Sequence, residues 1–568
     1  MRPAVTRRTA ITYGAGALAA ALAAPELLRA ARAGATPGPG TAPAARAAQA
    51  LGPELRRPRV LRSRRGRLDV KLVCKPAVVD MGAPAPVRTW TYDGLVPGNT
   101  WELRGGDVLR VDLRNRLPEL RGEGDHDHAT MDRPHEWTTT NLHTHGLHVS
   151  PRGNSDNVFL AVPPGERQRY EIELPEDHPA GLFWYHPHRH GGVCQQVRAG
   201  MAGLLIVRGD LDDVPEVRAA KERILVMQAI EVGPDYALMD PIPNPTKEQA
   251  FFPRTNLMYT VNGRMKPTIT MYPGEVQRWR LLNAAEGKFM SLALEGHDLH
   301  VLGWDGLTLA EPEGEELLMM SAGNRVDALV QAGRPGVYEL MLTPGSSQRP
   351  NIPGMPRSAD QDEVAATASR RAQSLLCDLS ASAASPRAGA AQSPDAQPPE
   401  LQPRSIATVV VRGSGPRMRL PHDLPAFRPP RLKVVRRRRF EFTVERDPDN
   451  EFLSFGVDGR PFVMGNKPYR ARLGTAEEWT LVNGTDNKLA DHAHVYHVHV
   501  NPFKITAING RRLSRPQWRD TQALTGRTGD SLTFEVGFTD FTGRFVEHCH
   551  VLSHEDLGMM NAIEVVRR

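Results

Sequence analysis

The stretch Gly106-Asp-Val-Leu-Arg-Val-Asp-Leu-Arg-Asn115 decides the class of fold, because a phrase of the same design recurs twice along the chain. The later copies run from Gly274 to Asn283 and from Gly474 to Asn483, with the same distance between glycine and asparagine. Apolar residues alternate with polar ones inside each copy, which is the period of a half-buried β-strand. Three widely spaced copies of one strand predict three β-sandwich domains in tandem.

Composition agrees with an all-β protein that has no membrane span. The 568 residues include 50 Gly and 48 Pro, as expected for many short strands joined by turns. No apolar run approaches the ~20 residues of a membrane-spanning helix. The net charge is +6, and residues 1–33 supply +4 of it through five Arg and one Glu. The basic balance therefore gives no indication of a nucleic-acid partner.

Residues 1–33 are predicted to be an export signal. Arg7 and Arg8 precede an uncharged, Ala-rich stretch from Thr9 to Pro25, and Ala31-Arg32-Ala33 follows as a small-x-small cleavage site. The paired arginines before a weakly hydrophobic stretch resemble a twin-arginine (Tat) signal, with an ordinary Sec signal as the alternative. We expect the Tat export machinery as a partner and a periplasmic or secreted location.

The repeats place the first domain at 55–210, the second at 215–345 and the third at 406–568. The extra length before the third domain falls at 346–405. Within it, residues 378–399 contain 15 Ala, Ser or Pro among 22 residues. Such a composition cannot bury enough apolar surface to order itself, so 346–405 is predicted to be a mobile insertion or linker.

Histidine spacing indicates the chemistry of the chain. Ten of its 20 His lie in clusters with spacings of two to four residues. Side chains at i and i+2 of an extended chain share a face, so each His-x-His pair directs two imidazoles at one metal site. The clusters are His143/His145, His186/His188, His494/His497/His499 and His548/His550/His554.

The same parity divides the ligands between two sites. His494 lies three residues before His497 and so on the opposite face, and Cys549 points away from His548 and His550. The first site is predicted to consist of His494, Cys549, His554 and Met559. Two imidazoles, a thiolate and a weak axial thioether are the ligands of a blue copper centre, whereas zinc prefers four strong ligands.

The second site collects imidazoles alone. Eight imidazoles without a protein anion suit two or three copper ions with positions left open for a small ligand. Cys549 binds at the first site and is flanked in sequence by ligands of the second, so it forms a short covalent bridge for electrons. The eight residues are His143, His145, His186, His188, His497, His499, His548 and His550.

These motifs resemble those of the multicopper oxidases, the laccase-like and bacterial copper-efflux oxidase family, from about residue 60 to the end. The resemblance implies three tandem cupredoxin-like Greek-key β-sandwich domains, four copper ions, and reduction of dioxygen to two waters by four electrons taken singly from a reducing substrate. The implied type 1 ligands are His494, Cys549, His554 and Met559. The implied type 2 ligands are His143 and His497, and the type 3 pair takes His145, His186, His188, His499, His548 and His550.

Reduction of dioxygen consumes four protons, so carboxylates are expected near the copper cluster as relays. Asp156 and Glu555 resemble the family's relay acids, and the alternative for Asp156 is an ordinary turn aspartate. His126 and His128 lie among acidic residues and are expected to belong to a solvated loop, with an accessory metal as the alternative. Export permits one disulfide among Cys74, Cys194 and Cys377, and the sequence does not select the pair.

The reducing substrate is predicted from the insertion. Copper-efflux oxidases of this kind carry a Met-rich insertion that binds Cu(I), whereas residues 346–405 contain only Met355. We therefore rank a laccase-like oxidase of phenols and other aromatic donors first. A metallo-oxidase of Cu(I) or Mn(II) in metal tolerance is the alternative. Two alternatives come from other functional classes, a non-catalytic copper store and a copper nitrite reductase.

Overall fold

The structure, a computed structural model, describes residues 51–120, 135–238, 256–345, 403–446, 453–486 and 493–567. All of them belong to one unit, Ala50–Arg568, which alone is described below. The predicted signal, nearly all of the predicted insertion, and His126 and His128 lie outside the described residues. In the described part of the chain, no helix is long and apolar enough to cross a membrane.

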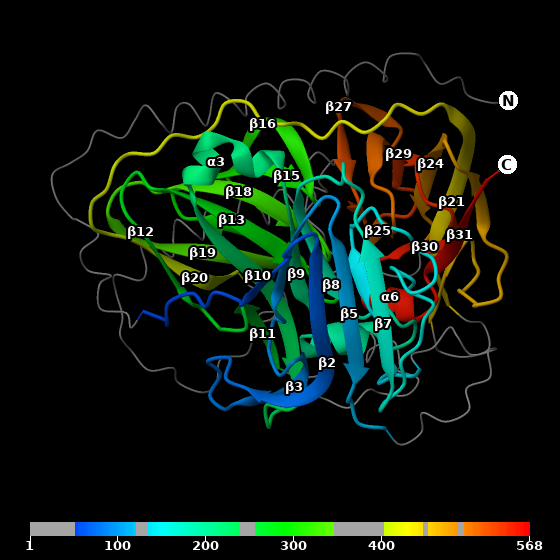
Figure 1. Cartoon of the computed structure of the whole chain (residues 1–568), viewed down its shortest axis with the longest axis horizontal. Coiled ribbons are helices and arrows are strands. Elements are labelled where there is room, and N and C mark those ends of the chain that lie inside the picture. Colours follow the sequence, from blue (N-terminus) through cyan, green and yellow to red (C-terminus); the bar gives the residue numbers. More distant parts are fainter. Residues whose placement is uncertain are drawn as a thin grey trace, which may run out of the picture. The chain divides into compact units, whose positions relative to one another are not determined.

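The first sandwich consists of two sheets, whose strands run from blue to teal in Figure 1. Its core contains Trp101, Leu109 and Phe183. One sheet has the order β1 (Val60–Arg62), β4 (Thr100–Arg104), β9 (Gly203–Arg208), β8 (Gly181–His186) and β6 (His143–His145). The other has the order β3 (Val87–Tyr92), β2 (Arg67–Val79), β5 (Val108–Asn115) and β7 (Arg167–Glu173).

The middle sandwich repeats this plan around Trp279, Leu292 and Val409, and its strands are largely green in Figure 1. One sheet has the order β11 (Asn256–Val261), β10 (Lys221–Val232), β13 (Val276–Asn283), β18 (Arg325–Gln331), β15 (Leu299–Trp304) and β16 (Leu307–Glu315). The other has the order β12 (Thr268–Met271), β20 (Arg404–Val411), β19 (Gly336–Gly345), β14 (Phe289–Leu294) and β17 (Leu318–Met320).

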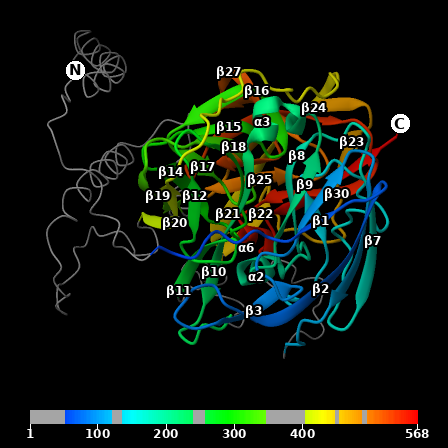
Figure 2. The ribbon, with the colours of Figure 1, turned by 60° about the vertical axis from the view of Figure 1, so that its left-hand side comes forward.

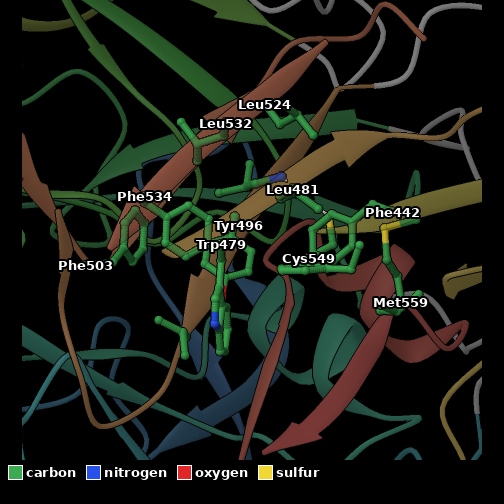
Figure 3. Close-up of a cluster of buried hydrophobic side chains, with 14 of the residues drawn as sticks. Phe442, Trp479, Leu481, Tyr496, Phe503, Leu524, Leu532, Phe534, Cys549 and Met559 are labelled. Carbon is green, nitrogen blue, oxygen red and sulfur yellow. Dashed lines mark hydrogen bonds between the residues drawn. The ribbon is translucent and has the colours of Figure 1, made fainter. Parts of the chain in front are cut away.

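The third sandwich packs around Trp479, Tyr496 and Phe534, with Cys549 and Met559 at one end of the same cluster (Figure 3). Burying a side chain of this size contributes ~1.5–3 kcal/mol. One sheet has the order β22 (Leu453–Val457), β21 (Val434–Arg446), β24 (Thr475–Asn483), β29 (Ser531–Phe538), β26 (Phe503–Ile508) and β27 (Arg511–Arg519). The other has the order β23 (Tyr469–Arg472), β31 (Met560–Val566), β30 (Gly543–Cys549), β25 (His494–Val498) and β28 (Thr521–Leu524).

The recurring phrase forms the same strand in all three sandwiches. Its copies are β5, β13 and β24, each parallel to the preceding long strand and antiparallel to a later one. Alternation places one face of each strand in the core, as with Leu109, Val111 and Leu113 of β5. The prediction of an all-β chain with three repeated sandwiches is confirmed.

Strand β20 corrects the expected start of the third domain. Residues 404–411 pair with β12 in parallel and with β19 in antiparallel orientation, so they complete the middle sandwich instead of opening the third. The predicted insertion therefore lies within the β19–β20 connection of one sheet. The equivalent connections of the other sandwiches, β8–β9 and β30–β31, contain the short helices α2 (Val193–Ala199) and α6 (Leu552–Asp556).

These two helices join the first and third sandwiches, and Figure 2 shows their labels side by side. Val193 and Val197 of α2 pack against Leu552 of α6. The carboxylate of Asp556 accepts hydrogen bonds from the backbone N–H groups of Gly191, Val193 and Cys194, at 2.7, 3.2 and 2.7 Å. The contact fixes the α6 segment, which carries His554. Helix α3 (Pro215–Ala219) and a 3₁₀ turn (Asp210–Asp213) lead into the middle sandwich.

Candidate metal centre

Four strands bring eight imidazoles together where the first and third sandwiches meet. His143 of β6 pairs in register with His186 of β8, and His497 of β25 pairs with His548 of β30. The two halves interlock, because His143 stacks on His499 and His145 stacks on His497, with ring centroids 3.9 and 3.8 Å apart. All eight side chains are buried. The predicted second site is thus a single cluster of histidines drawn from two domains.

Three of these imidazoles direct the same ring atom at one point. The Nε2 atoms of His188, His499 and His548 lie 3.1 to 3.3 Å from one another. Glu555 faces His188 Nδ1 at 3.4 Å and His548 Nδ1 at 3.0 Å. Because a carboxylate only accepts, its position favours a proton on each Nδ1 atom and a lone pair on each Nε2 atom. Three ring nitrogens that converge in this way could hold a metal ion between them.

His143 and His497 are also oriented by a hydrogen-bond acceptor at Nδ1. His143 Nδ1 donates to the carboxylate of Asp156, 3.0 and 3.1 Å from its two oxygens, and His497 Nδ1 donates to the carbonyl of Asp520 at 2.8 Å. The Nε2 atom of each ring is buried and has no hydrogen-bond partner among the described residues. A buried ring nitrogen left with a lone pair is a ligand position for a metal.

The remaining three rings, His145, His186 and His550, lie with centroids 5.0 to 5.7 Å apart. His186 Nδ1 donates to the carbonyl of Pro187 at 2.7 Å, which leaves Nε2 for a ligand. His145 is turned the other way, because its Nε2 faces Thr521 Oγ1 at 3.1 Å and its Nδ1 has no partner in the described part of the chain. These three rings lie in the same buried cluster as His188, His499 and His548, and the division into type 2 and type 3 ligands stays a prediction.

Burial keeps this cluster uncharged. Burial lowers the pKa of His188 to about 3. Burial and the neighbouring imidazoles also hold the pKa well below its ordinary value in His145, His186, His497, His499 and His550. Neutral imidazole is the form that binds metal ions, so the ring nitrogens, their burial and their protonation all fit a metal cluster.

A second, smaller site lies on the other face of β30. Cys549 Sγ is 3.7 Å from both His494 Nδ1 and His554 Nδ1, and the three ligand atoms lie within 4.8 Å of one another. Burial raises the pKa of the Cys549 thiol to about 12, and a coordinating metal removes that proton outright. Two imidazoles and a thiolate in a buried apolar pocket fit a blue copper ion.

Met559 is held beside this site by the backbone. Its N–H donates to the carbonyl of His554 at 2.9 Å, and its carbonyl accepts from the N–H of Cys549 at 3.0 Å. Its side chain is fully buried in the cluster that contains Cys549 and Phe442 (Figure 3). Met560 packs in a different cluster, with Val546. The structure thus favours Met559 over its neighbour as the thioether of the site.

The two acids singled out from the sequence contact ligand imidazoles, and both are buried. Asp156 also accepts from the N–H of Thr144 at 2.8 Å. Glu555 lies between His188 and His548, and these histidines lower its pKa to about 2 although burial alone would raise it. Both carboxylates therefore orient imidazole rings and fix which nitrogen carries the proton.

Sequence reasoning missed three other buried polar residues at the cluster. Asp520 and Thr521 lie at the start of β28, and Arg325 begins β18 of the middle sandwich. Arg325 forms a double ion pair with Asp520, and one of its distances is 2.8 Å. Burial and Asp305 raise the pKa of Asp520 to about 6, and Arg325 opposes that rise. The only sequence signal was a pair of charged positions at the edges of apolar strands.

Other titratable residues of the sequence analysis lie apart from the cluster. His297 and His300 belong to the middle sandwich, and His297 Nε2 accepts from the N–H of Gly333 at 3.0 Å. Cys74 and Cys194 are free thiols, so no disulfide joins them, and Cys377 lies outside the described residues.

Comparison with known proteins agrees with this geometry. Family models of multicopper oxidases match residues 135–212, 239–358 and 428–568, more than half of the chain. A laccase of Bacillus subtilis is 23% identical over 524 residues, which cover 84% of this chain and 90% of that protein. The multicopper oxidase MmcO of Mycobacterium tuberculosis is 24% identical over 529 residues, 87% of this chain and 86% of that protein.

Solved structures show the same fold. A multicopper oxidase of Campylobacter jejuni, described as a metallo-oxidase, has a TM-score of 0.68 at 22% identity and covers 91% of this chain and 96% of its own. A laccase-like multicopper oxidase of Ochrobactrum has a TM-score of 0.65 at 22% identity, covering 90% of this chain and 100% of its own. Fold, matched domains and paired histidine clusters lead to one conclusion: the chain belongs to the multicopper oxidase family.

Proposed function

We propose that the protein couples four one-electron oxidations of a reducing substrate to the reduction of dioxygen to water. The observation that carries this proposal is the pair of adjoining sites on β30. Cys549 faces His494 and His554 on one side of the strand, and His548 and His550 face the histidine cluster on the other. A single donor site joined by one residue to a multi-imidazole site suits electron transfer from a reductant to dioxygen.

Twelve side chains would hold the copper ions. The type 1 ion would be held by His494, Cys549, His554 and Met559, and the type 2 ion by His143 and His497. The type 3 pair would be held by His145, His186, His188, His499, His548 and His550. When bound, copper accepts single electrons at the first site and supplies them to dioxygen at the second.

The chain's own residues orient ligands and carry protons. Asp156 and Glu555 keep a proton on Nδ1 of the rings they contact, so that Nε2 of each ring faces the ligand position. Reduction of dioxygen to two waters consumes four protons, and these buried carboxylates are the acids nearest the ligand rings. We assign them as the groups that deliver protons. The backbone between Cys549 and its flanking histidines is the shortest covalent connection between the sites.

For the reducing substrate we favour phenols and related aromatic donors. The support is the composition of residues 346–405, whose single Met offers few thioethers for Cu(I), and the laccases among the relatives. Oxidation of Cu(I) or Mn(II) is the second candidate. It is favoured by the burial of His494 and His554, which are 0% and 1% exposed, because a bulky phenol has little access to either ring.

Oxygen consumption by the copper-loaded protein tests both the proposed oxidase activity and the proposed substrate class. Steady-state rates are measured with a phenol, with Cu(I) and with Mn(II) as donors. A blue absorption band and oxygen uptake with any donor support the oxidase, and the ratio of the three kcat/KM values selects the substrate class. A copper-loaded protein that consumes no oxygen with any of them would be a copper store and would refute the proposal.

We also propose export through the Tat machinery, on the strength of the paired arginines Arg7 and Arg8 and the cleavage site that ends at Ala33. Expression with the native leader and with Arg7 and Arg8 changed to Lys tests it. We expect processed protein outside the cytoplasm for the native leader and unprocessed protein for the variant. Normal processing of the variant would indicate Sec export.

A further inference from the structure

Arg325 is a fully buried cation that touches all three sandwiches. Its Nε donates to the carbonyl of Leu182 in the first sandwich at 3.2 Å, and its Nη2 donates to the carbonyl of Asp305 in the middle one at 3.0 Å. In the third sandwich it holds both carboxylate oxygens of Asp520. A planar guanidinium with five donors suits such a junction, which a lysine ammonium does not reproduce.

The carboxylate that Arg325 holds leads to a predicted copper ligand through one hydroxyl group. Thr521 Oγ1 lies 2.8 Å from Asp520 Oδ1 and 3.1 Å from His145 Nε2. Arginine only donates and an ionised carboxylate only accepts, so the Thr521 hydroxyl donates to Asp520. Its oxygen is then left to accept, and the proton of His145 must sit on Nε2.

The direction of these hydrogen bonds determines which nitrogen of His145 can bind a metal. With its proton on Nε2, His145 presents the lone pair of Nδ1, which has no partner within the described ranges. His143, His186, His188, His497 and His548 are oriented the opposite way, with Nδ1 held by an acceptor. The Thr521 hydroxyl therefore faces the protonated nitrogen of His145, and it also lies 3.3 Å from His497 Nδ1.

The ion pair of Arg325 and Asp520 packs directly against the backbone that follows His145. Gly146 follows His145 with φ of 87°, and a Cβ on it would lie 2.3 Å from Arg325 Nη2 and 2.5 Å from Asp520 Oδ2. The ion pair thus fills the place of a side chain next to the histidine pair of β6. The backbone that carries His145 is positioned by a residue of the middle sandwich, to which our assignment gives no copper ligand.

We propose that Arg325 and Thr521 are positioning residues, which set the tautomer and orientation of His145 through the chain Arg325, Asp520, Thr521 and so prepare the histidine cluster for copper. The inference rests on the proposed function, because it concerns copper binding by those histidines. Through Arg325, the middle sandwich would then help to position a ligand of the histidine cluster.

Thr521→Val and Thr521→Ser form the matched pair that tests this. Valine keeps the shape and removes the hydroxyl, whereas serine keeps the hydroxyl. Loss of a partner that orients a metal ligand costs ~10–100-fold in metal affinity. We expect that loss for copper in the histidine cluster of Thr521→Val, measured by equilibrium competition with a chelator, and an altered EPR spectrum of the type 2 copper. Thr521→Ser is expected to match the wild type.

The type 1 site provides an internal control, because its ligands do not contact Thr521 within the described residues. The blue band and the thermal unfolding of the copper-free protein should be unchanged in both variants. Arg325→Lys should show the same selective loss, and Arg280→Lys should not. Arg280 is an equally buried arginine of the middle sandwich whose partners are Glu222, Asp212 and Asp327.

Two results would overturn the inference. Wild-type copper affinity and EPR spectrum in Thr521→Val would show that the hydroxyl does not position His145. Equal loss of the blue band and of the cluster copper in Arg325→Lys, with a lower unfolding temperature, would show a purely structural ion pair. Wild-type protein whose histidine cluster takes up no copper would instead refute the proposed function.

Discussion

Replacement of Glu555 by Gln tests the proposed centre at its most constrained point. The carboxylate is fully buried and faces two imidazoles at once, with His188 Nδ1 at 3.4 Å and His548 Nδ1 at 3.0 Å. Glutamine has nearly the same shape, but it offers one acceptor oxygen and one donor NH₂ group. One of the two rings must therefore face a donor with its own N–H, or move its proton to Nε2 and lose its ligand lone pair.

The size of the effect follows from the contact that is lost. A hydrogen bond to a charged group contributes ~1.5–3 kcal/mol, and loss of a partner that orients a metal ligand lowers metal affinity ~10–100-fold. At ~1.4 kcal/mol for each factor of ten, the two estimates agree. We therefore expect copper in the histidine cluster to bind ~10–100-fold more weakly in Glu555→Gln. The Cys549 site should keep its affinity and its blue band.

Two measurements check this expectation. Equilibrium copper competition gives the affinity, and stopped-flow absorbance separates reduction of the blue copper by a phenol from its reoxidation by dioxygen. Reoxidation should slow in variant protein that is fully loaded, because Gln cannot relay a proton, while reduction keeps its wild-type rate. Unchanged copper affinity together with wild-type reoxidation would refute both roles of Glu555. Equal slowing of both half-reactions would indicate a distorted site instead of a lost proton donor.

Four further changes test other parts of the molecule. Cys549→Ser should abolish the blue band and turnover, measured by visible absorbance and oxygen uptake. Met559→Leu should raise the type 1 potential in a redox titration, because a thioether favours Cu(II), and should cost less than ~1.5 kcal/mol in a denaturant titration. Burial alone would raise the pKa of Asp212, but Arg278 lowers it to about 2. The lowered pKa stabilises the folded state above the unfolded pKa near ~3.9, and this contribution is lost as the pH falls towards 2. The unfolding temperature of Asp212→Asn should therefore fall less on acidification than that of the wild type. Replacement of residues 346–402 by a short turn should leave phenol turnover unchanged. It should stabilise the fold by about 2 kcal/mol in calorimetry or a denaturant titration, because closing a short turn costs less entropy than closing a long connection.

The grouping of the proposed ligands could be predicted because strand parity is a local property. His497 and His499 face one side of β25 and His494 faces the other in the sequence and in the structure alike. The same rule separated Cys549 from the histidines beside it. Met559 was harder, since the sequence offers two adjacent methionines, and the backbone bonds of Met559 to Cys549 and His554 distinguish them.

Parity gives no information about contacts between domains. Thr521 and Asp520 follow β27 in a segment with no distinctive spacing, and Arg325 lies 195 residues before Asp520. Nothing local indicates that these residues meet, because the contact exists only once three sandwiches have packed. A buried arginine at the start of an apolar strand is a weak signal, since a buried arginine can equally pair with an acid of its own sheet, as Arg278 does with Asp327.

The position of β20 was missed for a related reason. The predicted boundary at residue 406 assigned most of Arg404–Val411 to the third domain, because this stretch follows the insertion in sequence. In the structure β20 pairs with β19, from which it is separated by 58 residues of chain between Gly345 and Arg404. Closing a connection of that length costs only about 2 kcal/mol more than closing a short turn. The buried strand face, with Ile406, Ala407 and Val409 in the middle core, outweighs that cost. The length of a connection is therefore a poor guide to a domain boundary, because the strand that completes a repeated sheet can follow a long insertion.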